Sequence, residues 1–136
     1  IREEKQSELA RAKARFANII HPSAIISPHA SIGEGSVVFA NAVVNSCAVV
    51  GAGVIVNTGA VVEHDCVVGD FAHISPNAVL AGGVVVGHNA WVGSCASLRQ
   101  LVSVGEASVI GMGAVVTKDV ESGVTVVGNP ARTLRQ

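Results

Sequence analysis

The sequence AVVGAGVIVNTGAVVEHDCVVGD, residues 48–70, repeats one pattern every six residues. Each unit has a small or β-branched residue and, two positions later, an aliphatic residue. Ala48 with Val50 and Val54 with Val56 are examples. In a β-strand, residues two positions apart point to the same side, and the residue between them points to the other side. The pattern therefore predicts a short β-strand in which the small residue and the aliphatic residue both point inward. The rest of each unit often contains glycine, which predicts a corner in the backbone.

This repeat runs without a slip from Ile20 to Val116, with Ile, Val or Leu at seventeen consecutive sixth positions. Glycine follows the aliphatic residue every eighteen positions, and we expect it there because the corner needs a backbone bend that other residues strain to adopt. The positions are Gly33, Gly51, Gly69, Gly87 and Gly105. Three six-residue sides therefore make one coil, and successive coils pair as parallel strands about 4.8 Å apart. The pattern predicts an all-β chain, a triangular parallel β-helix of five to six coils.

The flanks of the repeat differ from it. Residues 2–15 are rich in helix-forming residues and contain no Gly or Pro, which predicts one short N-terminal helix. Residues 16–20 read as a short strand leading into the repeat, and residues 124–132 as a last strand with a Gly-Asn-Pro turn. We expect residues 1–19 to be the last pieces of an upstream domain, and residues 20–136 to be the β-helix with its C-terminal tail.

Composition excludes several classes of function. The net charge of −1 gives no electrostatic basis for binding nucleic acid or a membrane surface. No apolar run approaches the length of a membrane span, and no secretory signal is visible, so we expect a cytoplasmic protein. The three cysteines Cys47, Cys66 and Cys95 match no zinc pattern, and they are expected to be reduced thiols. Cys66 occupies an inward position, which makes it a poor nucleophile.

The outward position of the strands is apolar in nearly every unit. It holds Val37, Val43, Val49, Ile55, Val61, Val67, His73, Val79, Val85 and Trp91. An outward aliphatic row is an exposed apolar patch, and such patches usually mark subunit contacts. Because three flat-sided prisms can pack around a threefold axis, we expect a homotrimer.

Two of the five histidines stand apart from the lattice. His64 lies between Glu63 and Asp65 at a predicted corner, where a carboxylate can orient an imidazole and stabilise its protonated form. His73 replaces an aliphatic residue in the outward row. His21, His29 and His88 have no such setting and are expected to be structural. A short His-x4-His spacing is absent, so no zinc site is predicted.

The gapless repeat resembles the left-handed parallel β-helix of the hexapeptide acyltransferases, and the handedness is taken from this resemblance. Residues 57–74, with their Glu-His-Asp segment and a second histidine nine residues later, are similar to bacterial sugar acetyltransferases acting on nucleotide-linked amino sugars or sialic acid. The similarity spans roughly residues 15–132. It implies acetyl-CoA-dependent N-acetylation of a nucleotide-activated amino sugar in surface glycan biosynthesis. One alternative is O-acetylation of sialic acid or a related sugar. The other is a purely structural trimerisation module without catalysis.

The resemblance also implies roles for individual residues. The histidine matching His64 is the general base, and Asp65 orients it. The one matching His73 lies beside the acetyl group and thioester. Backbone N–H groups near Gly82, and near Met112 beside Gly111, contact the acetyl oxygen and the pantetheine arm. The turn near the adenine and phosphates of coenzyme A corresponds to Gly128, Asn129, Pro130 and Arg132. No metal takes part, and relatives carry an upstream domain that binds the nucleotide sugar.

Geometry adds one expectation. His64 is placed at a corner and His73 within a later strand, so roughly 15–20 Å of chain path separates them along one coil. They converge more readily when one comes from each of two neighbouring chains. We therefore expect active sites between protomers of the homotrimer.

Overall fold

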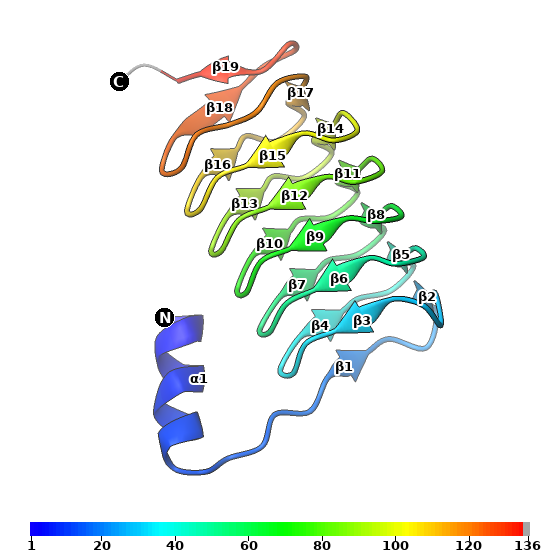
Figure 1. Cartoon of the computed structure of the whole chain (residues 1–136), viewed down its shortest axis with the longest axis vertical. Coiled ribbons are helices and arrows are strands. Elements are labelled where there is room, and N and C mark those ends of the chain that lie inside the picture. The colour runs from blue at the N-terminus through cyan, green and yellow to red at the C-terminus, as the bar shows by residue number, and fades with distance from the viewer. Residues whose placement is uncertain (135–136) are drawn as a thin grey trace.

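The computed structural model describes residues 1–134, in which the chain coils into a three-sided stack of short strands (Figure 1). Strands eighteen residues apart are hydrogen-bonded in parallel, so that Val37 pairs with Ile55 and Ile55 with His73. The predicted coil length is therefore confirmed, and the fold is the left-handed parallel β-helix of hexapeptide repeats.

The three sheets form the three faces of the prism, here called faces A, B and C. Face A contains β1 (Ile19–Ile20), β4 (Val37–Val38), β7 (Ile55–Val56), β10 (His73–Ile74), β13 (Trp91–Val92), β16 (Val109–Ile110), β18 (Thr125–Val127) and the antiparallel β19 (Arg132–Thr133). Face B contains β2 (Ile25–Ile26), β5 (Val43–Val44), β8 (Val61–Val62), β11 (Val79–Leu80), β14 (Ser97–Leu98) and β17 (Val115–Val116). Face C contains β3 (Ser31–Ile32), β6 (Val49–Val50), β9 (Val67–Val68), β12 (Val85–Val86) and β15 (Ser103–Val104).

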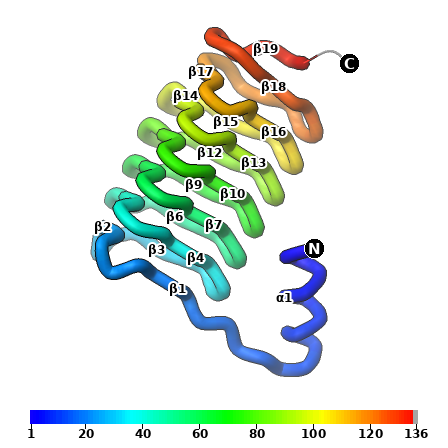
Figure 2. Tube along the Cα trace, turned by 180° about the vertical axis from the view of Figure 1, so that it is seen from behind, coloured from blue at the N-terminus to red at the C-terminus, as the bar shows by residue number. Residues whose placement is uncertain are grey.

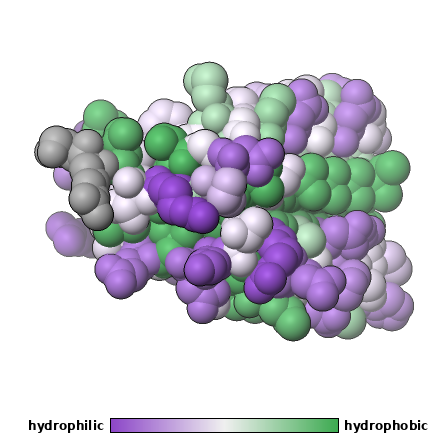
Figure 3. Space-filling view, turned by 90° about the horizontal axis from the view of Figure 1, so that it is seen from above, coloured by the Kyte–Doolittle hydropathy of each residue, from purple (hydrophilic) through white to green (hydrophobic). Residues whose placement is uncertain are grey.

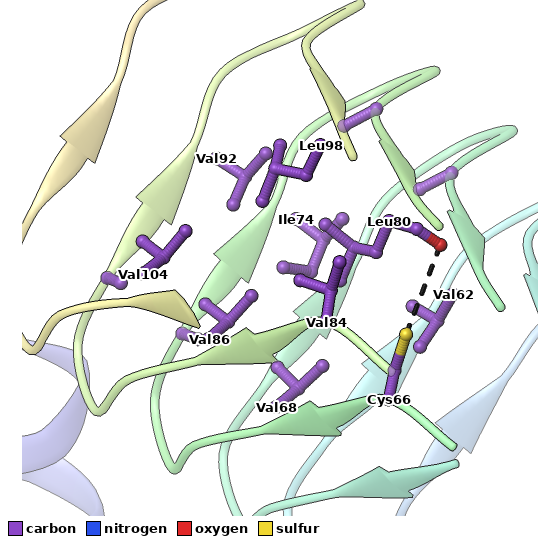
Figure 4. Packing of buried hydrophobic residues seen from close by; sticks show 14 of the residues in the cluster. Val62, Cys66, Val68, Ile74, Leu80, Val84, Val86, Val92, Leu98 and Val104 are labelled. Carbon is purple, nitrogen blue, oxygen red and sulfur yellow. Dashed lines mark hydrogen bonds between the residues drawn. The ribbon is translucent and has the colours of Figure 1, made fainter. Parts of the chain in front are cut away.

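The interior of the prism is built from the two inward rows that the repeat predicts. The second residue of each strand from β4 to β17 is buried, and so is the small or β-branched residue two positions before it. Figure 4 shows how these side chains meet from the three faces around Ile74 and Leu80. Side chains this small suit the narrow space between three sheets, where a larger group would force the coils apart.

The glycine ladder has a different cause from the one predicted. Gly33, Gly51, Gly69, Gly87 and Gly105 do not adopt positive φ. They are required because consecutive coils approach closely there: a Cβ on Gly33 would lie 2.5 Å from the carbonyl carbon of Gly51, and one on Gly87 would lie 2.6 Å from the amide nitrogen of Glu106. The expectation of a strained bend at these positions was therefore wrong.

The left-handed conformation occurs instead at the third residue of the corners from Gly35 to Gly113. Glycine holds this place at Gly53 and Gly83, and asparagine at Asn41 and Asn77, as expected for φ near +60°. Several side chains with no such preference are also there, among them Asp65 and Leu101, with φ of 60° and 63°. Each adopts an unfavourable backbone conformation that the lattice enforces.

The outward apolar positions form three rows, not the single row read along the sequence. Face A presents Ile55, His73 and Trp91 in register, so His73 stacks between these two and not between valines. Face B presents Ile25, Val43, Val61, Val79, Ser97 and Val115, and face C presents Ser31, Val49, Val67, Val85 and Ser103. Seen from above, hydrophobic residues reach the surface in bands between hydrophilic ones (Figure 3).

Helix α1 spans Arg2–Arg11 and ends four residues before the predicted boundary. Lys13 adopts φ 60°, and the Ala14 N–H donates to the Leu9 carbonyl, which closes the helix in the manner of a Schellman motif. The predicted strand at 16–20 shrinks to Ile19–Ile20. Within residues 1–134 no helix is long and apolar enough to cross a membrane.

Helix α1 stands beside the stack, joined to β1 by an extended segment (Figure 2). Its contacts lie on the CA edge, the row of corners that joins face C to face A. The Arg2 guanidinium donates to the carbonyls of Gly53 and Phe71, at 3.0 and 2.6 Å. Glu3 accepts from Asn89 at 2.6 Å and lies 3.3 Å from His88 Nε2. The helix therefore covers part of the CA edge, and within residues 1–134 its side-chain contacts with the stack lie on this edge.

Candidate functional site

His64 lies on the BC edge, the row of corners that joins face B to face C, directly after β8. Its Nδ1 lies 2.8 Å from Asp65 Oδ2, and both side chains are more than half exposed. The left-handed backbone at Asp65 turns its carboxylate back toward the preceding residue. A carboxylate on Nδ1 selects the tautomer that carries the Nδ1 proton, which leaves Nε2 as a free base. The predicted corner position of His64 is confirmed.

The same pair changes the acidity of the imidazole. The hydrogen bond that His64 donates to Asp65 is the largest cause that raises the pKa of His64 above its ordinary 6.5, and the Asp65 and Glu63 charges act in the same direction. Glu63 has a second, structural role, since its Oε2 accepts from the His64 backbone N–H at 3.1 Å. Asp65 therefore orients the ring, while Glu63 holds the corner.

Gly82 leaves space for the Nε2 side of the His64 imidazole. It occupies the equivalent corner position one coil later, and a Cβ there would lie 2.6 Å from both Nε2 and Cε1 of His64. Any side chain at Gly82 would displace the ring. Among the described residues no acceptor is found for the Gly82 N–H, and the preceding Ala81 has no side chain able to cap it. A free donor and a free base therefore lie side by side on the surface.

His73 belongs to a different setting, on face A. Its ring stacks on Trp91 with centroids 5.9 Å apart and planes inclined by 3°, and its Nε2 lies 3.2 Å from Asn57 Nδ2. Burial lowers the pKa of His73, and the positive charge of Arg2 lowers it further. The imidazole is therefore neutral near pH 7, in contrast to that of His64, whose pKa is raised.

Asn57, Trp91 and Ser75 were not among the predicted site residues. Trp91 Nε1 donates to Ser75 Oγ at 2.8 Å, which fixes the indole below His73. The eighteen-residue length of a coil could have predicted that Trp91 lies next to His73, because residue 91 comes one coil after residue 73. The hydrogen bonds of Asn57 and Ser75 depend on side-chain directions at the corner, for which the repeat contains no signal.

The two histidines of one chain are not brought together. In a triangular cross-section the BC edge, which carries His64, is the corner opposite face A, which carries His73. The core of the prism lies between them. Gly111 and Met112 lie instead on the AB edge, which joins face A to face B. With Ser75 and Trp91 they line a hollow of about 220 Å³, and Met112 is 82% exposed.

The remaining predicted residues lie at the C-terminal end of the prism. Gly128, Asn129 and Pro130 form the turn between β18 and β19, and Arg132 belongs to β19. Arg132 lines a hollow of about 250 Å³ together with Lys118, a cation of the BC edge that was not predicted to take part. Asp119 also lines this hollow, and its carboxylate accepts from the Ser103 backbone N–H at 2.8 Å. The two cations outnumber this one carboxylate, which favours an anionic ligand.

The cysteines and possible metal ligands are also placed. Cys66 points into the prism, and its Sγ lies 3.2 Å from the Ala81 carbonyl (Figure 4 shows the side chain turned inward). Burial raises the pKa of this thiol, so the reactive thiolate is disfavoured. Cys47 and Cys95 are exposed corner residues with positive φ. Residues 1–134 contain no group of three or more His, Cys, Asp or Glu side chains placed to hold a metal ion.

Solved structures share this architecture closely. The chain is similar to the acetyltransferase domain of PglB from Neisseria gonorrhoeae FA1090, with 44% identity and a TM-score of 0.97 over 98% of this chain and 65% of that one. That domain has also been solved in complex with acetyl coenzyme A. PerB from Caulobacter crescentus, in complex with CoA and GDP-perosamine, has 39% identity and a TM-score of 0.94, covering 97% of this chain and 64% of that one.

WeeI from Acinetobacter baumannii AYE is a third similar structure, with 34% identity and a TM-score of 0.94 over 98% of this chain and 65% of that one. This chain thus spans about 65% of the length of each of these three structures. No family model and no curated protein matches the sequence.

Proposed function

We propose that this chain, which belongs to the left-handed β-helix family of hexapeptide-repeat acetyltransferases, transfers an acetyl group from acetyl-CoA to the amine of a nucleotide-linked amino sugar. The observation that carries this proposal is the exposed His64–Asp65 pair, whose free Nε2 lies directly over Gly82. The complexes of similar structures with acetyl coenzyme A and with GDP-perosamine support the classes of donor and acceptor.

The reaction follows from the chemistry of this pair. The sugar amine attacks the thioester carbonyl carbon, and His64 Nε2 accepts the proton that nitrogen loses as the C–N bond forms. Asp65 stabilises the resulting imidazolium. When the C–S bond breaks, the CoA sulfur leaves with the electron pair and takes the proton from the imidazolium. The products are the N-acetylated sugar and free CoA, formed by direct attack without an acyl-enzyme, and the buried Cys66 takes no part.

The carbonyl oxygen becomes negative in the tetrahedral intermediate, and a donor placed beside the base stabilises that charge. We assign this role to the Gly82 N–H, for which no acceptor is found among the described residues. From there the donor extends along the BC edge toward the C-terminal end. Lys118 is three coils, or about 14 Å, beyond His64 along the prism axis. Lys118 and Arg132 then meet the phosphates of coenzyme A near the turn at 128–130.

The site is completed by a second protomer in this proposal. Helix α1 occupies the CA edge, so three copies pack most readily with face B toward a threefold axis. Each BC edge then lies beside the AB edge of the next chain. His64 and Gly82 of one chain meet His73 and Met112 of its neighbour, and the exposed Trp91 and Met112 are covered. The neutral His73 is suited to a hydrogen bond beside the acetyl group.

Two further parts of the proposal concern context. We infer that residues 1–19 connect the β-helix to an upstream domain that binds the nucleotide sugar, because the similar structures extend beyond the matched region. We place the reaction in the cytoplasm, where acetyl-CoA is made.

The direct test is acetyl transfer by the purified chain. It is incubated with acetyl-CoA and GDP-perosamine, or with UDP-linked amino sugars, while thiol release and the mass of the sugar are followed. The expected result is one added acetyl group that withstands hydroxylamine, as an amide does. Removal of the group by hydroxylamine identifies an ester, and thus O-acetylation. A chain that binds no acetyl-CoA contradicts the proposed function.

The pH dependence of the reaction reports on the pair. His64 acts as a base only when neutral, so kcat/KM rises with pH and levels off above a pKa higher than 6.5. Asp65→Asn removes the main cause of the raised pKa, so the midpoint shifts to lower pH, and the plateau falls by about tenfold or more as the tautomer is lost. Asparagine suits the left-handed φ of position 65, so the fold is retained.

The amine of the acceptor sugar titrates in the same way with every variant. A difference in the pH midpoint between variants therefore reports on His64. Glu63→Gln is the matched control, since glutamine keeps an acceptor for the His64 backbone N–H, and the Glu63 charge is the smallest contribution to the raised pKa. An unmoved midpoint in Asp65→Asn contradicts the assignment.

A further inference from the structure

Leu101 is an unusual residue for the position it holds. It lies at the third corner position of the BC edge with φ 63°, and it is 75% exposed. A branched aliphatic residue gains nothing from either the left-handed backbone or contact with water. Its place is set by the lattice, because the Leu101 N–H donates to the Gly82 carbonyl at 3.0 Å, while the Gly83 N–H donates to the His64 carbonyl at 2.9 Å.

The Leu101 side chain leans toward the catalytic corner. A Cβ on Gly83 would lie 2.7 Å from Leu101 Cδ2, just as a Cβ on Gly82 would lie 2.6 Å from His64 Nε2. The imidazole and the isobutyl group therefore approach two adjacent glycines from the coils on either side. The glycine pair forms a gap that these two side chains border, and the ends of both side chains already fill the space over the glycines.

The two borders of this gap differ in chemistry. The border toward the N-terminus consists of Glu63, His64 and Asp65, which are charged or polar. The opposite border consists of Arg99, Gln100 and Leu101, which line an open hollow of about 500 Å³ with Ala81. Leu101 is the one aliphatic side chain larger than alanine among these residues of the BC edge.

We propose that Leu101 limits the length of the acyl group that the enzyme transfers, so that acetyl fits and longer chains do not. This inference rests on the proposed function, in which the thioester carbonyl lies against the Gly82 N–H. The alkyl part of the acyl group avoids the carboxylate border and extends toward the aliphatic one. The isobutyl group already fills the space over Gly83, so the acetyl methyl packs against it, whereas additional methylenes collide with Leu101.

The test is the donor preference of Leu101→Gly. Glycine suits φ 63°, so this change relieves backbone strain and is expected to preserve the fold, which thermal unfolding checks. Rates with acetyl-CoA, propionyl-CoA and butyryl-CoA are measured with GDP-perosamine as the acceptor. Because each methylene in an apolar pocket is worth about tenfold or more in kcat/KM, we expect the butyryl-to-acetyl ratio to rise at least about tenfold in the variant.

Ala107→Gly is the control, since it makes the same kind of backbone change at a left-handed corner of the CA edge. It should leave the donor preference of the wild type unaltered. An unaltered ratio in Leu101→Gly, or an equal loss of rate with all three donors, overturns the proposal. Failure of the proposed function is a separate result, because then the wild-type chain transfers no acetyl group to any acceptor.

Discussion

Replacing His64 with alanine should lower kcat for acetyl transfer by about 10³-fold, within the range measured for loss of a general base. The imidazole is exposed at a corner and is not part of the hydrophobic core, so the fold should be unaffected. Its Nε2 is the base that lies next to the free Gly82 N–H. Steady-state kinetics with acetyl-CoA and an amino-sugar nucleotide measure the loss, and calorimetric titration with acetyl-CoA measures donor binding.

Donor affinity should change little in the same variant, because the phosphates and the pantetheine arm contact other parts of the proposed site. His21→Ala serves as the control, since His21 is an exposed histidine whose hydrogen bond is local, to Ser23. A His64→Ala chain that retains full kcat would show that the base is another group. It would also favour the alternative of a β-helix that serves only as a structural module.

Replacing Val43 with lysine should dissociate the trimer, and the loss of the trimer should in turn abolish activity. Val43 lies on β5 of face B, between Ile25 and Val61, and in the proposed assembly three copies of it surround the threefold axis. Three ammonium groups there would be desolvated and would repel one another, a cost that no nearby carboxylate of face B offsets. Light scattering should report a monomer, and kcat should fall by about 100-fold or more because each BC edge loses the neighbouring AB edge.

Val49→Lys is the matched control. It lies in the same coil, also points outward and is 48% exposed, but it belongs to face C, which faces solvent in the proposed trimer. This variant should remain trimeric and active. The opposite pattern, with Val49→Lys dissociating and Val43→Lys intact, would place face C at the axis and contradict the arrangement.

Periodicity carried most of the information about the fold. The six-residue repeat predicted which residues are inward, and the burial of Val50, Val62 and Ile74 confirms it. It did not reveal why Gly87 is needed, because close approach between coils is a property of the stacked structure and not of one corner. Nor did it locate the end of α1, because a lysine in place of glycine terminates the helix.

The candidate site was predictable where it depends on neighbours in sequence. The pairing of His64 with Asp65 is of this kind, and the structure confirms their hydrogen bond. The clearance between Gly82 and the imidazole depends on contacts between coils, as does the stacking of Trp91 on His73. An outward row read along the sequence mixes three faces, so it does not show that His73 lies between Ile55 and Trp91 on face A. The trimer and the roles of individual site residues stay predictions.

Each active site should take His64 from one chain and His73 from the next, and mixed trimers test this arrangement. His64→Ala and His73→Ala chains are each expected to have low activity. When the two are unfolded together and refolded in equal amounts, random assembly pairs an intact His64 edge with an intact His73 edge at about a quarter of the sites. Recovery of about a quarter of the wild-type activity is the predicted result. If the mixture is no more active than its two components, the site lies within one chain and the account is contradicted.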